Sequence, residues 1–556
     1  MRKLIPYLFI LLLSFGWGQI KAQTCTVSID SSTPYIDAAA YPNIQAGDTV
    51  CLKSGNWDYI YLKGFHGTKD KPITFVNSLG AVVIKAITQP TNYVGIKIGN
   101  CSHIIFRGNG VSNIQYGFQV DTVAAGAGMG IDDFSTNIEI SHVEISHTAI
   151  GGVYAKTDPT CTNFNATRDK FTMYNFSFHD CYVHDVPNEG LYIGNSHYTG
   201  LHLTSTCDTT VYPQVLKGVK IYNNIIEHTG YDGIQVSSAD SGCVIHDNVV
   251  KFDSQSGTPS QMSGIIIGGG SKCTTYNNQI IDGKGDGIEV FGLGDYSIFN
   301  NLIVNAGKSY LPDQPNEMKQ GIYVGTDSTA AHAKLGIYNN TIISPKSFGI
   351  TLSNTQLDST KIINNLITTP GQYQNWGPRS FININSTSIK VDTLTNYTTN
   401  DTATVKFVAP DALNYELKPN SPAVDFGTNL TGEGVTFDLL NQPRPYHTYY
   451  DAGAYECQDP SVGIITHKAP DLAEFLLYPN PVKRKLNVRL TFSDSQTVTA
   501  QLTDLFGRIL SLQKLPFTAG QSQLFTFSVH QLPQGTYFIT IISDKGISSK
   551  GFIVQY

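Results

Sequence analysis

The stretch GIYVGTDSTAAHAKLGIYNNTI, residues 321–342, contains the two short phrases that decide the fold. The first phrase, Gly-Ile-Tyr-Val, places its apolar residues two apart, which is the spacing of one face of a β-strand. The second phrase, Ile-Tyr-Asn-Asn-Thr-Ile, alternates in the same way around a pair of asparagines. Each phrase returns, so that six copies lie between 23 and 43 residues apart, and such a period is typical of a solenoid.

The copies can be located by one residue of each phrase. The Gly phrases begin at Gly190, Gly233, Gly264, Gly287, Gly321 and Gly349, and the second Asn of the other phrase falls at Asn224, Asn248, Asn278, Asn301, Asn340 and Asn365. One coil of such short strands cannot bury its apolar face alone, whereas stacked coils can, with each strand parallel to its counterpart in the next coil. These phrases predict an all-β protein built as a single-stranded right-handed parallel β-helix.

Both repeated columns have a structural explanation. Asn tolerates left-handed backbone, and its amide can bond to the Asn above and below, so a stacked column would form an internal ladder. Gly would allow the tight bend that begins each strand. We therefore assign both columns to the scaffold and look for chemistry beside them.

Residues 1–22 have the form of a secretory signal. They begin Met-Arg-Lys, continue through LIPYLFILLLSFGWG and end in Gln-Ile-Lys-Ala, so a basic start precedes an apolar stretch and a small residue at the cleavage point.

Among the nine cysteines, Cys161 and Cys207 share a long insertion and form our hypothetical disulfide. Cys243 and Cys273 each precede their ladder Asn by five residues, which predicts neighbouring positions, either as a disulfide or as a thiol column.

Charge is distributed unevenly along the chain. The net charge is −7, and subtracting the +5 of residues 476–556 and the +3 of the signal leaves −15 on residues 23–475. An acidic exported body argues against nucleic acid as a partner. It also disfavours a polyanionic glycan, unless a local basic patch or bound Ca²⁺ bridges the charges.

Two segments resemble secreted β-helix proteins. The opening, with Gly47-Asp48-Thr49-Val50 and Lys71-Pro72-Ile73-Thr74, resembles the first coil of the chondroitinase B and alginate lyase family, within the pectate-lyase-like superfamily. The segment 413–456, which includes Asp425, Arg444 and Asp451, resembles the closing segment of such proteins, and we interpret those three residues as a cap network rather than a catalytic set. Catalytic motifs of the superfamily are missing, so this resemblance transfers no catalytic residue.

The C-terminal tail resembles the type A sorting domain of the type IX secretion system. The matching residues include Tyr478-Pro479-Asn480-Pro481, Asp504, Gly507-Arg508 and Gly535-Thr536-Tyr537. Alternating apolar residues independently predict a small antiparallel β-sandwich here. The resemblance implies a Bacteroidetes-type Gram-negative bacterium, contact with the type IX machinery, and release or attachment at the outer-membrane surface.

We expect the β-helix over 23–400, its closing segment over 401–457, a linker over 458–475 and the sorting domain over 476–556.

Candidate functional residues lie beside the Gly column. Stacking would align Glu189, Asp232 and Asp286, which directly precede their glycines, and we predict that they share Ca²⁺. An outward column two residues after each Gly would contain Tyr192, Gln235, Glu289 and Tyr323. For these two columns the alternative explanation is a solvated face of turn residues.

These residues suggest a polysaccharide-acting enzyme, most simply a lyase. In that hypothesis Lys319 or His184 acts as base and Glu289 as a further catalytic carboxylate, while Tyr192, Tyr231, Tyr323 and Gln235 hold the sugar. A glycoside hydrolase using the same carboxylates is the second enzymatic possibility. The alternative of another class is a non-catalytic adhesin or glycan-binding protein. We expect a monomer in every case.

Overall fold

The computed structural model describes residues 24–87, 94–204, 206–326, 329–330, 332–373, 377–458, 472–503, 509–543 and 546–556. The chain forms two compact units, one ending at Gln458 and the other beginning at Asp459. The expected signal peptide and most of the expected linker lie outside the described residues. Within the described ranges, no helix has the length and apolarity needed to cross a membrane.

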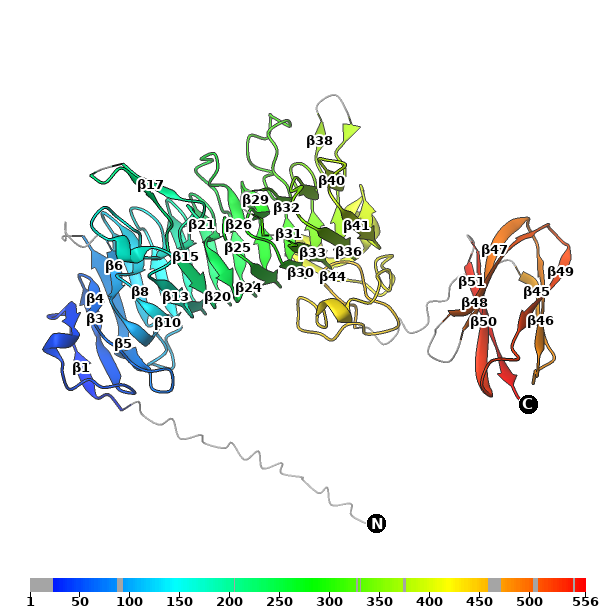
Figure 1. Ribbon diagram of the computed structural model, residues 1–556, viewed down its shortest axis with the longest axis horizontal. Helices are drawn as coiled ribbons and strands as arrows, with labels where there is room; N and C mark the ends of the chain where they lie inside the picture. The colour runs from blue at the N-terminus through cyan, green and yellow to red at the C-terminus, as the bar shows by residue number, and fades with distance from the viewer. Residues whose placement is uncertain are drawn as a thin grey trace, which may run out of the picture. The chain divides into compact units, whose positions relative to one another are not determined.

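The first unit is a parallel β-helix in which most coils contribute one strand to a twelve-stranded sheet, here called the narrow sheet (Figure 1). Its strands pair in parallel from coil to coil. In order they are β2 (Tyr35–Asp37), β4 (Ile60–Lys63), β6 (Val94–Gly99), β9 (Ala127–Asp132), β12 (Val153–Ala155), β16 (Leu191–Ile193), β22 (Ile234–Val236), β26 (Ser263–Ile267), β29 (Asp286–Val290), β32 (Ile322–Val324), β35 (Ile350–Leu352) and β40 (Ile382–Ile384).

The same coils contribute two strands each to a larger, 23-stranded sheet, which begins with β1 (Val27–Ile29), β3 (Thr49–Trp57) and β5 (Ile73–Ala86) and then splits into two rows. The row before the Asn column is β7 (Ser102–Arg107), β10 (Thr136–Ser141), β14 (Ser177–His179), β20 (Lys220–Tyr222), β24 (Cys243–His246), β27 (Cys273–Tyr276), β30 (Tyr296–Phe299), β33 (Lys334–Tyr338), β36 (Ser359–Ile363) and β41 (Val391–Leu394). The row after it is β8 (Phe118–Val123), β11 (Val143–Ser146), β15 (Tyr182–Val186), β21 (Ile225–Thr229), β25 (Val249–Lys251), β28 (Gln279–Ile281), β31 (Leu302–Val304), β34 (Thr341–Ile343), β37 (Leu366–Thr368) and β42 (Tyr397–Thr399). The predicted β-helix fold is confirmed.

The asparagine ladder runs through the corner between these two rows. The Nδ2 of Asn224 donates to Oδ1 of Asn248 at 2.9 Å, and the same bond repeats through every predicted ladder residue to Asn396. The ladder Asn residues from Asn224 to Asn365 are at most 1% exposed. The left-handed backbone lies one residue earlier, for example at Asn300 (φ 54°) and Asn339 (φ 49°). The ladder hydrogen bond and the left-handed backbone therefore belong to two neighbouring residues, whereas we expected one Asn to provide both.

The glycine column has a different cause from the expected bend. Gly190, Gly287 and their counterparts are not among the residues with positive φ. A Cβ on Gly287 would instead lie 2.5 Å from the carbonyl oxygen of Gly321 and 2.5 Å from Cγ2 of Ile303, and the other repeat glycines meet similar neighbours. The column is therefore required by the close approach of successive coils and not by backbone conformation.

Aromatic rings stack on the outer side of the larger sheet. Tyr222, His246, Tyr276 and Phe299 are each two residues before a ladder Asn, and adjacent rings lie 4.8–5.1 Å apart within 4° of parallel. His179 extends this stack with a centroid distance of 4.5 Å to Tyr222. Because each ring covers the next, we interpret the stack as scaffold.

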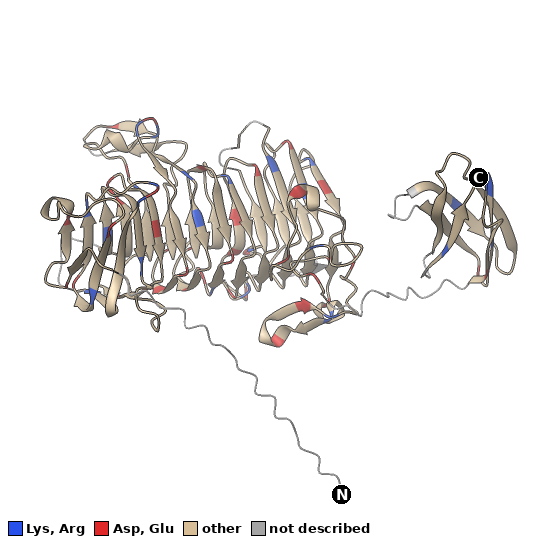
Figure 2. Ribbon diagram, turned by 90° about the horizontal axis from the view of Figure 1, so that it is seen from below, with Lys and Arg blue, Asp and Glu red and all other residues tan. Residues whose placement is uncertain are grey.

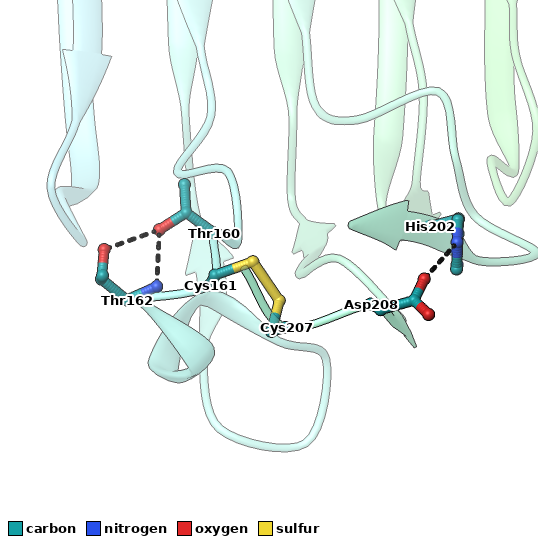
Figure 3. Close-up of a disulfide and its surroundings, with 6 residues drawn as sticks. All are labelled: Thr160, Cys161, Thr162, His202, Cys207 and Asp208. Carbon is teal, nitrogen blue, oxygen red and sulfur yellow. Dashed lines mark hydrogen bonds and ion pairs between the residues drawn. A yellow bond between two sulfur atoms is a disulfide. The ribbon is translucent and has the colours of Figure 1, made fainter. Parts of the chain in front are cut away.

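Three disulfides join described residues. The hypothetical Cys161–Cys207 bond is present and closes the insertion that follows β12 (Figure 3). Cys243 and Cys273 are directly opposed in register and form a second disulfide across adjacent coils. The third, Cys25–Cys51, joins the start of the chain to β3 of the larger sheet and was not expected.

The closing segment packs against the larger sheet over several coils, through hydrogen bonds to Asn300, Tyr338 and Asn364, rather than over the end of the solenoid as a cap. It contains η3 (Thr402–Val405), β43 (Phe407–Ala409), η4 (Pro410–Ala412), β44 (Asn414–Leu417) and η5 (Thr431–Glu433). Asp451 accepts hydrogen bonds from the backbone N–H groups of Asp425 at 2.7 Å and Cys457 at 2.6 Å, while Arg444 Nη2 donates to the Gly453 carbonyl at 2.8 Å. Asn339 Nδ2 donates to the Asp451 carbonyl, which ties this network to a coil.

The second unit consists of two antiparallel sheets that share one apolar core, as predicted for the tail. Asp504 and Gly507-Arg508 of the matching motif lie outside the described residues. The sheets are β45 (Leu472–Tyr478), β46 (Lys485–Phe492) and β49 (Ser522–Ser528), and β48 (Ile509–Phe517), β47 (Gln496–Thr503), β50 (Gly535–Ser543) and β51 (Gly546–Val554).

Replacing a repeat glycine tests the close-approach explanation. We expect Gly287→Ala to lower the free energy of unfolding by on the order of 3 kcal/mol, because the added methyl group overlaps backbone and core atoms that cannot move independently. Gly432→Ala is the control, since nothing lies within 4 Å of a Cβ placed there. Urea unfolding midpoints compare the two variants, and equal midpoints would contradict the explanation.

Candidate functional site

The narrow sheet aligns the predicted outward residues in one column. Tyr192 opposes Gln235, Gln235 opposes Ile266, Ile266 opposes Glu289, and Glu289 opposes Tyr323. The residues that directly precede the repeat glycines also stack from coil to coil. The N–H of Gly190 donates to the carbonyl of Asp232, which precedes Gly233, and the N–H of Gly287 donates to the carbonyl of Gln320, which precedes Gly321. The structure confirms that both predicted columns are aligned from coil to coil. The functional roles of their residues stay predictions.

A buried ion pair lies where β29 begins. Lys319 Nζ is 2.9 Å from Asp286 Oδ2 and donates to the Met262 carbonyl at 3.2 Å, while the Gln320 backbone N–H donates to Asp286 Oδ1 at 2.5 Å. Burial acts to lower the pKa of Lys319, but Asp286, Glu289 and Asp232 outweigh it and raise that pKa. Lys319 is therefore an ammonium that can stabilise negative charge, and in this state it cannot accept a proton as a base.

Glu289 is the carboxyl group suited to proton transfer. Its side chain is only partly exposed on the outward column, and its Oε2 accepts a hydrogen bond from Ser263 Oγ at 2.5 Å. Burial and, after it, the charge of Asp286 raise the pKa of Glu289 to about 7. A carboxyl group with a pKa near neutrality can both donate and accept a proton at physiological pH.

Asp232 is a buried carboxyl group that faces the same charges. Its side chain is 1% exposed, and within the described residues neither of its oxygens has a hydrogen-bond partner of ordinary geometry. Burial, followed by the charges of Glu289 and Glu189, raises its pKa well above the usual range. Unsatisfied buried carboxylate oxygens are costly for the fold, which favours a functional explanation.

Asp253 also belongs to this acidic group, although the sequence analysis did not single it out. It follows β25 and is 1% exposed, with Oδ1 accepting a hydrogen bond from Ser254 Oγ at 2.7 Å. Burial raises its pKa to about 6. Its position offered no sequence signal, because no other predicted ladder Asn is followed by a carboxylate at the same offset of five residues.

The other end of the column carries tyrosines and hydrogen-bonding groups. Lys156 Nζ lies 4.2 Å from the ring centroid of Tyr192, whose hydroxyl is 2.9 Å from Ser196 Oγ. Gln235 Nε2 donates to the same Ser196 oxygen at 2.8 Å. Glu189 accepts a hydrogen bond from the Tyr154 hydroxyl at 3.1 Å, and burial raises the pKa of Glu189.

Three predicted residues lie away from this arrangement or at its margin. His184 is on β15 in the larger sheet, with Nδ1 2.7 Å from Asp185 Oδ2 and its ring stacked 4.1 Å from Tyr182, so it is not brought to the narrow sheet. Tyr231 lies in the turn before β22, where its carbonyl accepts from Thr229 Oγ1. Tyr323 is on the column one coil beyond Glu289, with its ring centroid 6.0 Å from that of Phe291.

The insertion after β12 places a loop beside the narrow sheet. The Arg168 guanidinium lies 3.8 Å from the Tyr198 ring centroid, and Tyr198 in turn covers Gly270, just beyond β26. The Cys161–Cys207 disulfide joins the two arms of this insertion, and His202 Nε2 lies 3.2 Å from Asp208 beside it (Figure 3). The insertion is therefore held against the middle coils.

The predicted calcium site has no matching cluster in the described ranges. There, no three His, Cys, Asp or Glu side chains are grouped so as to share a metal ion. Asp286 instead forms an ion pair with Lys319, and Glu189 accepts a hydrogen bond from the Tyr154 hydroxyl. Ca²⁺ at Glu189, Asp232 and Asp286 stays a prediction that this donor set does not favour.

The pH dependence of stability tests the buried state of Asp253. Its pKa rises on folding from 3.8 to about 6, so the wild-type fold loses stability as pH rises through that window. We expect Asp253→Asn to remove this loss, and its stability relative to wild type to increase by on the order of 3 kcal/mol between pH 4 and pH 7. Urea unfolding at both pH values measures this difference, and a difference independent of pH would contradict it.

Comparison with known proteins identifies two regions of the chain. Residues 171–374 match the family model described as "Right handed beta helix region", and residues 476–555 match "Secretion system C-terminal sorting domain". No curated protein matches the sequence.

Several solved structures resemble the chain at low identity. A GH136 lacto-N-biosidase from Eubacterium ramulus is 13% identical, with 67% of each chain covered and a TM-score of 0.40. An alginate lyase from Paenibacillus sp. is 15% identical over 65% of this chain and 100% of its own, with a TM-score of 0.35. The A-module of the mannuronan C-5 epimerase AlgE4 of Azotobacter vinelandii is 16% identical over 68% and 95%, with a TM-score of 0.34.

Likeness at this distance carries no activity across. The two family matches, by contrast, agree with the strand pairing of each unit. The chain therefore consists of a right-handed β-helix followed by a secretion system C-terminal sorting domain, and it is a secreted or cell-surface protein.

Proposed function

We propose that this protein is a secreted polysaccharide-acting enzyme that hydrolyses glycosidic bonds on the narrow sheet of its β-helix. The observation that supports this proposal is that Glu289 and Asp232 lie close enough for the charge of Glu289 to raise the pKa of Asp232. Glu289 has a pKa of about 7 and lies on the outward column, while Asp232 has unpartnered carboxylate oxygens and a pKa that responds to the charge of Glu289. Glycoside hydrolysis uses two carboxyl groups, one that donates a proton and one that acts as base or nucleophile.

Glu289 and Asp232 have different roles in the proposed reaction. Protonated Glu289 donates its proton to the glycosidic oxygen as the bond to the sugar breaks, and the Ser263 hydroxyl fixes the orientation of this carboxyl group. In the molecules in which Asp232 is ionised, its carboxylate acts as general base on a water molecule that attacks the sugar carbon, because at 1% exposure it is too buried to contact the sugar itself. Asp286 is paired with the Lys319 ammonium, and its negative charge raises the pKa of Glu289 and so helps to hold the proton there.

Binding groups extend along the column from this pair. Tyr192 and Tyr323 lie on opposite sides of Glu289 in strand order, and each offers a partly exposed ring to a sugar face. Gln235 adds an amide between Tyr192 and the acid pair, and Tyr231 lies in the adjacent turn. We propose these four residues as sugar contacts, because the column points away from the core.

Elimination from a uronate is the second candidate. The Lys319 ammonium favours it, since a cation is needed to neutralise the uronate carboxylate, and Ca²⁺ on Glu189, Asp232 and Asp286 would serve the same purpose. The buried acidic group around Glu289 opposes it, because an acidic site repels an acidic sugar. We therefore place hydrolysis first.

The route to the site of action is also a proposal. We infer that the tail directs the protein through the type IX machinery to the exterior of the outer membrane, where it acts as a monomer on extracellular glycan. The sorting-domain match supports this inference.

Substitution of the two carboxyl groups tests the proposal. We expect Glu289→Gln and Asp232→Asn each to lower kcat by about 10²- to 10⁴-fold, because each removes one proton-transfer group. The control is Glu139→Gln, which removes a carboxyl group from β10 of the larger sheet and should leave kcat unchanged. The assay measures reducing ends released from neutral and acidic polysaccharides.

The products distinguish the candidates. Hydrolysis releases reducing ends without forming unsaturated sugars, whereas elimination gives unsaturated products that absorb in the ultraviolet. Such ultraviolet absorbance in the products would contradict hydrolysis and favour the lyase. Glycan binding without any turnover would contradict both and favour the adhesin.

A further inference from the structure

A second surface feature lies along the corner that follows the last strand of each coil. Five successive corner residues have left-handed backbone, with φ between 44° and 58°. Each donates its N–H to the carbonyl that ends the equivalent strand one coil on, so they form a continuous floor along the solenoid axis. These floor residues are Phe252, Asp282, Asn305, Ser344 and Thr369.

Three hollows adjoin along this floor. Their volumes are about 450, 690 and 620 Å³. The first shares Asn305 with the second and Lys308 with the third, and the second and third share Ser344 and Thr402. The closing segment forms one wall, so the hollows make a single groove that crosses five coils, a length of roughly 20 Å at the usual strand spacing.

The groove is lined by an unusual number of lysines for an acidic body. We call it the lysine groove, after Lys284, Lys308, Lys346, Lys406 and Lys418. Among the described residues, none of these five ammonium groups forms an ion pair, whereas Lys319, Lys272 and Lys361 elsewhere in the unit do. Figure 2 shows charged residues scattered among a large majority of other residues over the rest of the solenoid.

The hydrogen bonds of these lysines leave their charge unneutralised. Lys284 donates to the Gln255 carbonyl at 2.9 Å and Lys406 to the Asn420 carbonyl at 2.9 Å. Lys346, 9% exposed, donates to the carbonyls of Tyr310 and Leu311. Neutral carbonyl partners orient an ammonium group without cancelling its charge, so the electrostatic attraction for an anion persists.

The acidic residues of the groove are partly engaged within it. Asp282 Oδ1 accepts from Asn305 Nδ2 at 2.8 Å, and Asp401 Oδ1 accepts from the Ala403 N–H at 3.0 Å, while Asp411 lies in the first turn of η4. Three lining carboxylates, together with Glu317, whose charge acts on Lys346, stand against five ammonium groups and still leave a positive excess in a body of net charge −15. A locally positive groove on a negatively charged body attracts an anionic partner to this surface.

We propose that the lysine groove binds an anionic glycan chain, whose carboxylate or sulfate groups pair with successive lysines. The floor and wall add Ser344, Thr402 and Asn420 as hydrogen-bonding partners for sugar hydroxyls. A chain fits better than a small anion, because Lys284, Lys308 and Lys346 follow one another from coil to coil while Lys406 and Lys418 line the facing wall. This surface is separate from the narrow sheet and its function does not depend on Glu289.

Binding to polygalacturonate tests the proposal. The variant replaces the three exposed lysines, Lys308→Gln, Lys406→Gln and Lys418→Gln, and leaves the less exposed Lys284 and Lys346 in place. The matched control replaces three exposed lysines elsewhere, at Lys69, Lys170 and Lys390, by Gln. Calorimetry of the mature full chain with polygalacturonate and with neutral dextran, at low and at roughly sixfold higher NaCl, measures Kd. We expect at least a roughly tenfold weaker Kd for polygalacturonate in the groove variant only, and a weaker Kd at high salt.

Further outcomes separate this proposal from its competitors. Equal weakening in the control variant would mean diffuse attraction and would overturn the proposal, as would no polygalacturonate binding at low salt. Equal affinity for a single-stranded oligonucleotide would overturn the assignment to glycan. Glu289→Gln should retain the wild-type Kd, whereas loss of binding in that variant would place the anionic chain on the narrow sheet. Circular dichroism of each variant confirms folding.

Discussion

The hydrogen bond from one ladder asparagine to the next is the interaction on which the rest of the structure depends. Each amide donates to the Asn of the following coil and to backbone carbonyls, so one side chain per turn satisfies the buried corner and sets its register. In a parallel strand a slip of one residue would exchange the buried and exposed faces. The ladder therefore decides which residues of the narrow sheet face outward.

That register has an electrostatic consequence. It stacks the residues that precede the glycines, and in the middle coils these include Asp232 and Asp286, with Glu289 on the outward column beside them. Carboxyl groups packed this closely and this deeply can be retained only if some are protonated or paired with a cation. Lys319, from a loop between coils, supplies a cation to this group. Burial raises the pKa values of Glu289, Asp232 and Asp253, and neighbouring carboxylates raise those of Glu289 and Asp232 further.

Sequence patterns could predict whatever the repeat controls. The Asn ladder, both columns and the opposed Cys243 and Cys273 all follow from period and alternation. The cause of the Gly column could not be predicted, because steric contact between coils depends on how closely they stack. Asp253 and the lysine groove were also missed, since no other predicted ladder Asn has a carboxylate at the offset of Asp253 and two of the groove lysines, Lys406 and Lys418, come from the closing segment outside the repeat. His184 looked suitable by its neighbours along the chain, but the corner geometry turns it onto the larger sheet.

The structure of Glu289→Gln with a bound substrate oligosaccharide tests the central claim most directly. The account predicts that a glycosidic oxygen lies within hydrogen-bond distance of the substituted side-chain amide at position 289. It also predicts that the adjoining sugar carbon faces Asp232 across one water molecule, with flanking rings near Tyr192 or Tyr323. An oligosaccharide bound with no glycosidic bond between position 289 and Asp232 would contradict it.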